Sequence, residues 1–242
     1  MKNSPHITLA VLVVACMLGL SACGSGIKSA TTTAPKVTPA SVAKLMPKFV
    51  DQPLTPGQVY RPRAFSPALT FKLPDAGWTS DLSPSGHVGI RLLVGPPVEW
   101  STFGIHRMDR VFDPIRGGRT AADAKPAPPD FAAWLEHHPR LQASRPVDIT
   151  IGGAKGVQID IVPKSYPRAR PDECDQGPSP QCLPLFTVGN EPIVYPKGSK
   201  TRMYIVDVKG KQVVFEVFVD PGTQFAKLAP LYDKVLRGIH FA

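Results

Sequence analysis

The chain has 242 residues, a formal net charge of +9 at pH 7 and a hydrophobic fraction of 43%. Beyond one apolar stretch at the N-terminus, no segment is apolar over the roughly 20 residues that a membrane-spanning helix needs. The remaining length suffices for one domain with a hydrophobic core, and no internal repeat is visible.

The first 22 residues have the layout of a bacterial secretion signal. Lys2 is followed by an apolar stretch of 14 residues, from Ile7 to Leu20. That length suits a signal-peptide core of roughly 7–15 residues better than a membrane-spanning helix of about 20. We therefore expect residues 1–22 to be a signal peptide. The alternative is an uncleaved anchor helix, or a signal that is cut elsewhere.

The run Leu20-Ser21-Ala22-Cys23 at the end of this stretch resembles a bacterial lipobox. The resemblance implies cleavage between Ala22 and Cys23 and attachment of a diacylglyceryl lipid to the Cys23 thiol. The lipid on Cys23 would hold the chain on the extracytoplasmic face of the cell membrane. We therefore expect a lipoprotein whose membrane partner is the bilayer, reached through this anchor.

Residues 23–59 are predicted to form a flexible tether rich in Pro, Thr, Ser and Ala. The segment has few large apolar side chains, so it cannot bury enough surface to offset the loss of chain entropy on folding. Within it, residues 42–46 have the pattern of a single helical turn. We expect one folded domain over residues 60–242.

Strand signals dominate the predicted domain. Apolar residues alternate, or run in short stretches bounded by Gly and Pro, over residues 68–73, 88–94, 100–108, 147–151, 156–162, 185–188, 203–208 and 213–219. Gly152-Gly153 and Lys209-Gly210-Lys211 separate neighbouring stretches and indicate hairpins. Residues 239–241 can add a last edge strand.

Two helices are expected. Asp130 can cap a short helix with Phe131, Trp134 and Leu135 on its apolar face. Thr223 can cap a closing helix that ends at Gly238, and Pro230 either kinks this helix or marks a later start. Its apolar face holds Phe225, Leu228, Leu231, Tyr232, Val235 and Leu236. Strands joined by short turns, with two helices far apart in the chain, predict an α+β domain in which an antiparallel β-sheet has flanking helices.

Cys174 and Cys182 are the two cysteines that remain after Cys16 leaves with the signal and Cys23 carries lipid. An extracytoplasmic compartment permits disulfides, and the polar segment between the two cysteines is rich in turn residues. We predict a structural disulfide that stabilises this short loop. A metal site is disfavoured because no second cysteine pair or histidine lies at ligand spacing, and a redox-active pair is disfavoured by the long separation.

The densest basic stretch of the chain holds Lys197, Lys200, Arg202, Lys209 and Lys211. Outside the cytoplasm nucleic acid is not an expected partner, so these residues point to an envelope protein, lipid or glycan that carries negative charge. The alternative is a solvated basic surface without a specific partner.

Motifs for catalysis do not appear in the sequence. It has no nucleophile elbow, no serine–lysine set of penicillin-binding enzymes and no phosphate-binding loop. His137 and His138 stand at the end of the first expected helix, where cations suit the helix dipole. We expect no catalytic residue, no metal and no cofactor. The predicted function is a non-catalytic binding or interaction domain; the alternatives are an envelope hydrolase with an unrecognised site and a structural spacer.

Loose motifs recur along residues 60–242, and their order is informative. They are Phe71-x-Leu73-Pro74-x-x-Gly77-Trp78, Phe131-x-x-Trp134-Leu135-x-x-His138-Pro139, Ile151-Gly152-Gly153-x-x-Gly156, the pair Cys174 and Cys182, Tyr204-Ile205-Val206-Asp207-Val208-x-Gly210, and Val235-Leu236-x-Gly238-Ile239-x-Phe241. This order resembles actinobacterial lipoprotein domains with the PsbP/Mog1-like fold and, more distantly, mycobacterial lipoproteins of the LpqN/LpqT type. The resemblance implies a central antiparallel sheet with helices packed on it, and a binding or assembly role without catalysis.

Overall fold

The computed structural model describes residues 42–47, 49, 51–82, 88–93, 100–172, 174, 181–219 and 225–242. These residues belong to one compact unit, Ala40–Ala242. The expected signal peptide, the lipidation site at Cys23 and residues 24–41 of the expected tether lie outside the described residues.

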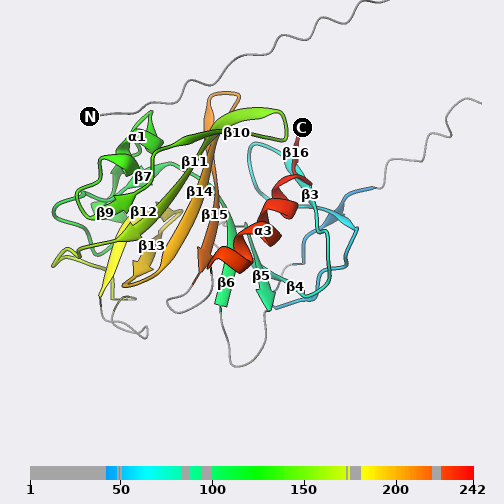
Figure 1. Ribbon diagram of the computed structural model, residues 1–242, viewed down its shortest axis with the longest axis horizontal. Helices are drawn as coiled ribbons and strands as arrows, with labels where there is room; N and C mark the ends of the chain where they lie inside the picture. The colour runs from blue at the N-terminus through cyan, green and yellow to red at the C-terminus, as the bar shows by residue number, and fades with distance from the viewer. Residues whose placement is uncertain are drawn as a thin grey trace, which may run out of the picture. The chain divides into compact units, whose positions relative to one another are not determined.

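A large antiparallel sheet forms the centre of the unit (Figure 1). Its strands stand in the order β10 (Val147–Ile151), β11 (Ala154–Pro163), β14 (Lys200–Val208), β15 (Lys211–Val219), β6 (Trp100–Arg107), β5 (Val88–Leu93) and β4 (Trp78–Leu82). The short strand β9 (Leu141–Ala143) also pairs with β11. Most of the paired strands in this sheet thus follow one another directly in the sequence.

Both faces of this sheet are buried along its central strands. Successive side chains of a strand point to opposite faces, and in the middle of β14, from Met203 to Val206, both sets are apolar. Tyr204 and Val206 belong to one hydrophobic cluster, whereas Met203 and Ile205 belong to a second. We call these the first and second clusters. A strand buried on both faces needs a covering layer on each side.

The first cluster is covered by a helix and a small sheet. Helix α3 (Phe225–Leu236) packs against β15 and β3. The small sheet has the order β1-β2-β3-β16, with bounds Lys44–Leu45, Val59–Arg61, Leu69–Lys72 and His240–Phe241. Figure 1 shows α3 beside β3 and β16.

The second cluster is covered by another sheet and by α1 (Phe131–Glu136). This sheet has the order β13-β12-β7-β8, with bounds Glu191–Pro196, Cys182–Val188, Arg110–Val111 and Lys125–Pro126. Every residue of β12 is buried, which explains why its sequence is an almost continuous apolar run. The central sheet therefore lies between two covering layers.

The predicted antiparallel sheet is confirmed, and β-structure dominates the fold more than the expected α+β class implies. The described helices α1 and α3 are short, with six and twelve residues. Asp130 caps α1 as predicted, because its carboxylate accepts a hydrogen bond from the Ala133 N–H at 2.9 Å. Strand β13 was not predicted, because its proline-containing stretch lacks an alternating pattern.

The folded unit begins earlier than the predicted boundary at residue 60. The side chains of Met46 and Leu54, 0% and 4% exposed, belong to the first cluster. Residues 44–45 form strand β1, paired in parallel with β2, rather than a helical turn. Isolated apolar residues among prolines have no periodic signal, so the sequence pattern assigned them to the tether although tertiary contacts hold them.

Both predicted hairpin turns are confirmed. Gly152 and Gly153 join β10 to β11 with φ angles of 55° and 84°. Lys209 and Gly210 join β14 to β15 with φ angles of 55° and 78°. Two consecutive positive φ angles match the twist of the flanking strands.

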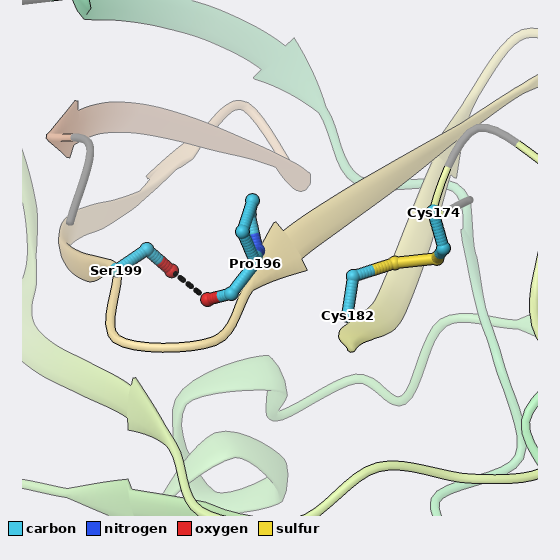
Figure 2. Close-up of a disulfide and its surroundings, with 4 residues drawn as sticks. All are labelled: Cys174, Cys182, Pro196 and Ser199. Atoms are coloured by element: carbon cyan, nitrogen blue, oxygen red, sulfur yellow. Dashed lines mark hydrogen bonds between the residues drawn. A yellow bond between two sulfur atoms is a disulfide. The ribbon is translucent and has the colours of Figure 1, made fainter. Parts of the chain in front are cut away.

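A disulfide joins Cys174 to Cys182 at the start of β12, with a Cα–Cα distance of 5.5 Å (Figure 2). Both cysteines are buried. Cys182 also pairs with Pro196 of β13. Beyond Pro196 the chain turns, and the Ser199 hydroxyl donates a hydrogen bond to the Pro196 carbonyl at 2.7 Å. The disulfide therefore ties the segment after β11 to the end of the covering sheet.

An ionisable pair lies inside the second apolar layer. Nε2 of His106 (β6) is 2.7 Å from Oε2 of Glu216 (β15), and the two side chains are 1% and 7% exposed. The His106 ring packs edge-on against Phe186, with centroids 5.4 Å apart. Burial and the nearby Glu216 raise the pKa of the Tyr195 phenol. The pair joins neighbouring strands of the central sheet to the layer that covers them.

Removing one partner of this pair should be costly. We predict that His106→Leu lowers the free energy of unfolding by about 3–5 kcal/mol, because the Glu216 carboxylate stays buried without its partner. The double variant His106→Leu/Glu216→Leu should lose clearly less than the sum of the two single variants. Urea unfolding of the four proteins measures this coupling. Strictly additive losses would show that the two side chains do not stabilise each other.

Candidate functional site

A groove opens where the cover of the first cluster ends, between α3 and the β10–β11 hairpin. Its volume is about 440 Å³. We call it the α3 groove; its lining residues are Ile149, Thr150, Ile151, Gly152, Gln158, Tyr204, Asp233, Leu236 and Arg237. A second hollow of about 450 Å³ shares Ile149 and Thr150 with it and continues to Lys155 of β11.

Glycine shapes the floor beside this groove. Gly156 of β11 pairs with Ile149 on one side and with Val206 on the other. A Cβ at position 156 would lie 2.0 Å from the Ile205 carbonyl oxygen, so the backbone approach there admits only glycine. Because residue 156 has no side chain, the surface of the sheet is also recessed next to Ile149. The motif around Gly152-Gly153 thus serves both the turn and the floor.

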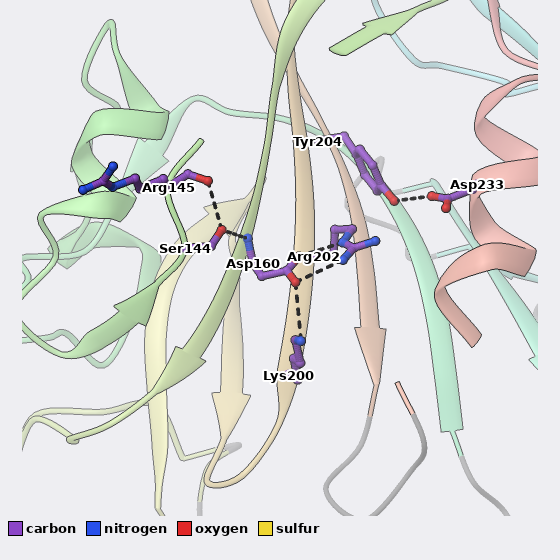
Figure 3. A network of polar contacts seen from close by, with 7 residues as sticks. All are labelled: Ser144, Arg145, Asp160, Lys200, Arg202, Tyr204 and Asp233. Carbon is purple, nitrogen blue, oxygen red and sulfur yellow. Dashed lines mark hydrogen bonds and ion pairs between the residues drawn. The ribbon is translucent and has the colours of Figure 1, made fainter. Parts of the chain in front are cut away.

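A charged network continues along β14 from the groove (Figure 3). Arg202 donates to the Asp160 carboxylate from Nε at 2.6 Å and from Nη2 at 3.1 Å. The Lys200 ammonium lies 3.4 Å from the same carboxylate. Two cations therefore share one anion, and this end of the site carries net positive charge.

Burial by itself would raise the pKa of Asp160. The hydrogen bond and the positive charge of Arg202, together with Lys200, outweigh burial and lower that pKa below its ordinary value. Asp160 is thus an anion at neutral pH that holds Arg202 in place. The Ser144 hydroxyl donates to the Arg145 carbonyl and accepts the Asp160 N–H at 3.0 Å, which fixes the backbone at this position.

The first residue of α3 forms an apolar wall for the two cations. The Lys200 Nζ lies 4.5 Å from the centroid of the Phe225 ring, and the Arg202 Cζ lies 5.3 Å from it. Cations at such distances are attracted by the ring face. Phe225 is half-buried, so the ring and the two cations together offer an aromatic and positively charged surface to solvent.

Tyr204 links β14 to the middle of α3. Its hydroxyl donates a hydrogen bond to Oδ1 of Asp233 at 2.6 Å (Figure 3). Burial, and then this bond to Asp233, raises the pKa of the Tyr204 phenol. The phenol is therefore neutral at physiological pH and acts as a fixed donor. The contact also sets the distance between helix and sheet that forms the groove.

The polar groups of this site suit recognition better than proton transfer. The two cations beside Asp160 hold its pKa below the ordinary value, so this carboxylate lacks the raised pKa of a general acid. Asp233 accepts the Tyr204 hydroxyl. In the described ranges no group of three His, Cys, Asp or Glu side chains is placed to hold a metal ion. What the site offers is cation charge, aromatic surface and fixed hydroxyl groups.

The structure separates the five basic residues that the sequence brought together. Lys200 and Arg202 lie beside the α3 groove, and Lys197 precedes them in the β13–β14 turn. Lys209 follows the other end of the nine-residue strand β14, about 30 Å from Lys200 at roughly 3.3 Å per residue. The five residues therefore do not form one continuous surface, because an extended strand places its two ends far apart. Their role in binding a partner stays a prediction.

The distant pair has partners of its own. The Lys209 Nζ donates to the Ala242 oxygen at 2.9 Å, and the Lys211 Nζ donates to the Ser66 hydroxyl at 3.1 Å. Lys211 also lines a separate groove of about 340 Å³ with Arg107 and Asp109. These lysines fasten the hairpin end to neighbouring segments.

Sequence reasoning missed Asp160, Tyr204, Phe225 and Asp233 as site residues. Each was assigned to a strand or to a helix face by its apolar neighbours, and no spacing signals that β11, β14 and α3 meet. The signal that was available is the charge of Asp160 between the apolar residues Ile159 and Ile161 of the same strand. A charged residue at a half-buried position needs a partner, and that partner was Arg202.

The two histidines after α1 play different parts. Nδ1 of His137 lies 2.8 Å from the Ala133 carbonyl oxygen, consistent with the expected capping. His138 is buried instead, with its ring edge-on to Trp134 at 4.7 Å between centroids. Burial, followed by repulsion from Arg140 and Lys164, lowers the pKa of His138 to about 4. The expectation that His138 is a cation at the helix end is therefore wrong.

Within the described part of the chain, no helix has the length and apolar character needed to cross a membrane.

The sequence matches no protein-family model and no curated protein. Three solved structures are similar at low identity. LpqN of Mycobacterium tuberculosis, described as involved in cell envelope biogenesis, has a TM-score of 0.36 and 14% identity over 79% of this chain and 90% of its own. Cyanobacterial PsbP from Synechocystis has a TM-score of 0.35 and 15% identity over 78% of this chain and 95% of its own. A protein from Bacteroides thetaiotaomicron has a TM-score of 0.33 and 13% identity over 72% of this chain and 45% of its own.

The buried histidine generates a prediction about acid stability. His138 has a pKa near 4 when folded and about 6.5 when unfolded, so the unfolded chain binds more protons between these values. Stability is therefore complete above about pH 6.5 and falls as the pH drops toward 4, by about 3 kcal/mol at most from this one group.

We predict that His138→Asn flattens the decline of unfolding free energy between pH 7 and 4.5, because asparagine does not titrate and can still accept the Arg140 N–H. His137→Asn is the matched control, since His137 is exposed. Urea unfolding at several pH values measures both. Parallel curves for His138→Asn and the unmodified chain would contradict the assignment.

Proposed function

We propose that this protein is an extracytoplasmic lipoprotein, anchored through Cys23, whose PsbP/Mog1-like domain binds an anionic envelope component in the α3 groove without catalysis. The lipobox-like run Leu20-Ser21-Ala22-Cys23 supports the anchor. The tether then comprises residues 23 to about 41, since the chain from residue 42 onward includes parts of the folded unit.

One observation carries the binding role. Lys200 and Arg202 share the single carboxylate of Asp160 beside the exposed part of Phe225. The ion pair with Asp160 already holds the Arg202 side chain in place, so little side-chain entropy is lost when a ligand binds. Lys200 is half-exposed, and its Nζ lies at the longer distance of 3.4 Å from the Asp160 carboxylate. An anionic group can therefore take Lys200 as its partner without breaking the Arg202–Asp160 pair. The groove next to it gives room for the rest of the ligand.

The ligand class follows from this chemistry. A phosphate or carboxylate group satisfies the excess cation, and an apolar or sugar face packs on Phe225 and Tyr204. Anionic lipids, anionic glycans and acidic protein segments of the envelope share these features. We expect the association to weaken with salt, because exposed charges are screened over about 8–10 Å at physiological ionic strength.

The anchor has a direct test. We predict that the full chain incorporates a fatty-acid probe during growth and that Cys23→Ala abolishes the label, because the thiol at position 23 is the acceptor. The same variant should stay uncleaved at Ala22 or be released from the membrane. The Cys16→Ala chain serves as a check of specificity: it should incorporate as much probe as the unmodified chain. Equal label on Cys23→Ala would refute the anchor.

The role of the α3 groove is tested by neutralising Lys200, the cation in excess over the Asp160 carboxylate. We predict that Lys200→Gln weakens binding about fivefold, since one basic side chain near an anionic surface contributes about 1 kcal/mol. Folding should be spared because Arg202 still pairs with Asp160. Lys209→Gln is the matched control, with the same charge change at the far end of β14. Co-sedimentation with vesicles of anionic lipid, and capture on acidic envelope glycan, measure both variants.

Three results would each decide against a part of this proposal. Equal loss for Lys200→Gln and Lys209→Gln would show that only net charge matters. Unchanged binding by Lys200→Gln would show that the α3 groove is not the binding site. No binding by the unmodified chain to any envelope fraction would favour the spacer role.

A further inference from the structure

The edges of the sheets differ in how they are protected. An exposed edge strand offers unpaired N–H and C=O groups, and natural proteins shield such edges by covering them, shortening them or placing proline in them. In the central sheet, β4 is covered by residues 51–54, which bond to it through Asp51 N–H to Ser80 O, Ser80 N–H to Gln52 O and Leu54 N–H to Trp78 O. This side of the sheet is closed.

The smaller sheets are shielded by other means. Strand β13 contains Pro192 and Pro196, and β8 ends at Pro126. Strands β1 and β16 have only two residues each. A proline cannot donate to a neighbouring strand, and a two-residue edge offers too few groups to hold one.

Strand β10 has none of these protections in the described part of the chain. It has five residues, none of them proline, and it pairs with β11 alone in the described part of the chain. Its side chains alternate: Val147, Ile149 and Ile151 share one face, and Asp148 and Thr150 share the other. Val147 is 58% exposed, although it is a large apolar residue. The strand is also held firmly at its turn, where Gly152 packs closely against Ile239 and Phe241.

We propose that the β10 edge pairs with the β10 edge of a second copy of this chain, antiparallel and about a two-fold axis at Ile149. This register places all five residues in pairs: Ile149 faces Ile149, Val147 faces Ile151 and Asp148 faces Thr150 of the other copy. Apolar side chains thus continue along one face, and exposed Val147 gains an apolar neighbour. An axis at Asp148 would instead place two carboxylates opposite each other, which is unfavourable.

Charge complementarity supports the same register. Thr150 pairs with Lys155 of β11 within one copy. Across the axis, Asp148 would lie beside Thr150 of the second copy and, one strand further, Lys155 of that copy. A lysine side chain is long enough to reach a carboxylate across one intervening strand position. The symmetry produces this contact twice, once in each direction, and the Thr150 hydroxyl can donate to the same carboxylate.

The contact is small, so the dimer is weak and depends on concentration. One pair of five-residue edges buries less than the roughly 1,000 Å² of a stable interface. Binding of the α3 groove to its ligand does not require the dimer, and the dimer does not require the ligand. The two proposals therefore fail or succeed separately.

Cysteine cross-linking of the full chain in membranes tests the register. Directly opposed residues have Cα atoms about 4.5–5.5 Å apart, within the range of a disulfide. Ile149→Cys should therefore form a disulfide-linked dimer on mild oxidation. Thr150→Cys should not, because the two copies of residue 150 would be diagonal neighbours about 7–8 Å apart. A mixture of Asp148→Cys and Thr150→Cys chains should cross-link, and the unmodified chain shows what the native cysteines contribute.

Charge exchange gives a second measurement that leaves the core untouched. Sedimentation of the detergent-solubilised full chain should show at least fivefold weaker self-association for Asp148→Lys, and recovery in Asp148→Lys/Lys155→Asp. Ile149→Cys cross-linking that does not exceed that of Thr150→Cys would overturn the proposed dimer. Self-association unaffected by Asp148→Lys would do the same, as would capture of only an extended segment of another protein at β10.

Discussion

The structure depends on burying both faces of the strands at the centre of one sheet. Residues of β14 and β15 contribute to two hydrophobic clusters on opposite sides. Burial of apolar surface contributes about 25 cal/mol per Å², and it requires a cover on each face. The chain meets this demand with segments from opposite parts of its sequence. Strands β1 to β3 and α3 cover one face, and β7, β8, α1, β12 and β13 supply most of the cover on the other.

The candidate site arises where this cover ends. α3 lies over β15 and leaves the neighbouring strands β10, β11 and the adjacent side of β14 partly open, so half-buried polar residues occupy the gap. There Asp160 and Arg202 replace the apolar side chains that fill the centre of the sheet, and the buried Tyr204 lies at the border of the first cluster. Each of the three has a partner in the described structure. Strand β10 stands at the end of the central sheet beside this groove and pairs with β11 alone in the described part of the chain.

The sequence predicted the local elements better than their arrangement. Hairpins at Gly152-Gly153 and Lys209-Gly210, and the Asp130 cap, follow from local chemistry that does not depend on the rest of the fold. Met46 and Leu54 were missed because single apolar residues among prolines become core only through contacts distant in sequence. The basic residues were grouped by their closeness in the sequence. In an extended strand, however, residues only a few positions apart already lie far from each other in space. No local pattern could bring Asp233 to Tyr204.

Amide hydrogen exchange of the full chain tests most directly whether the segment before residue 60 is part of the two-sided cover. The N–H groups of Met46, Asp51 and Leu54 donate to Arg61, Ser80 and Trp78. The account predicts that these amides exchange about 100-fold or more slowly than in an unstructured chain, together with amides of the central strands β14 and β15. Exchange of residues 46–54 at the rate of an unstructured chain, with β14 and β15 still protected, would contradict it.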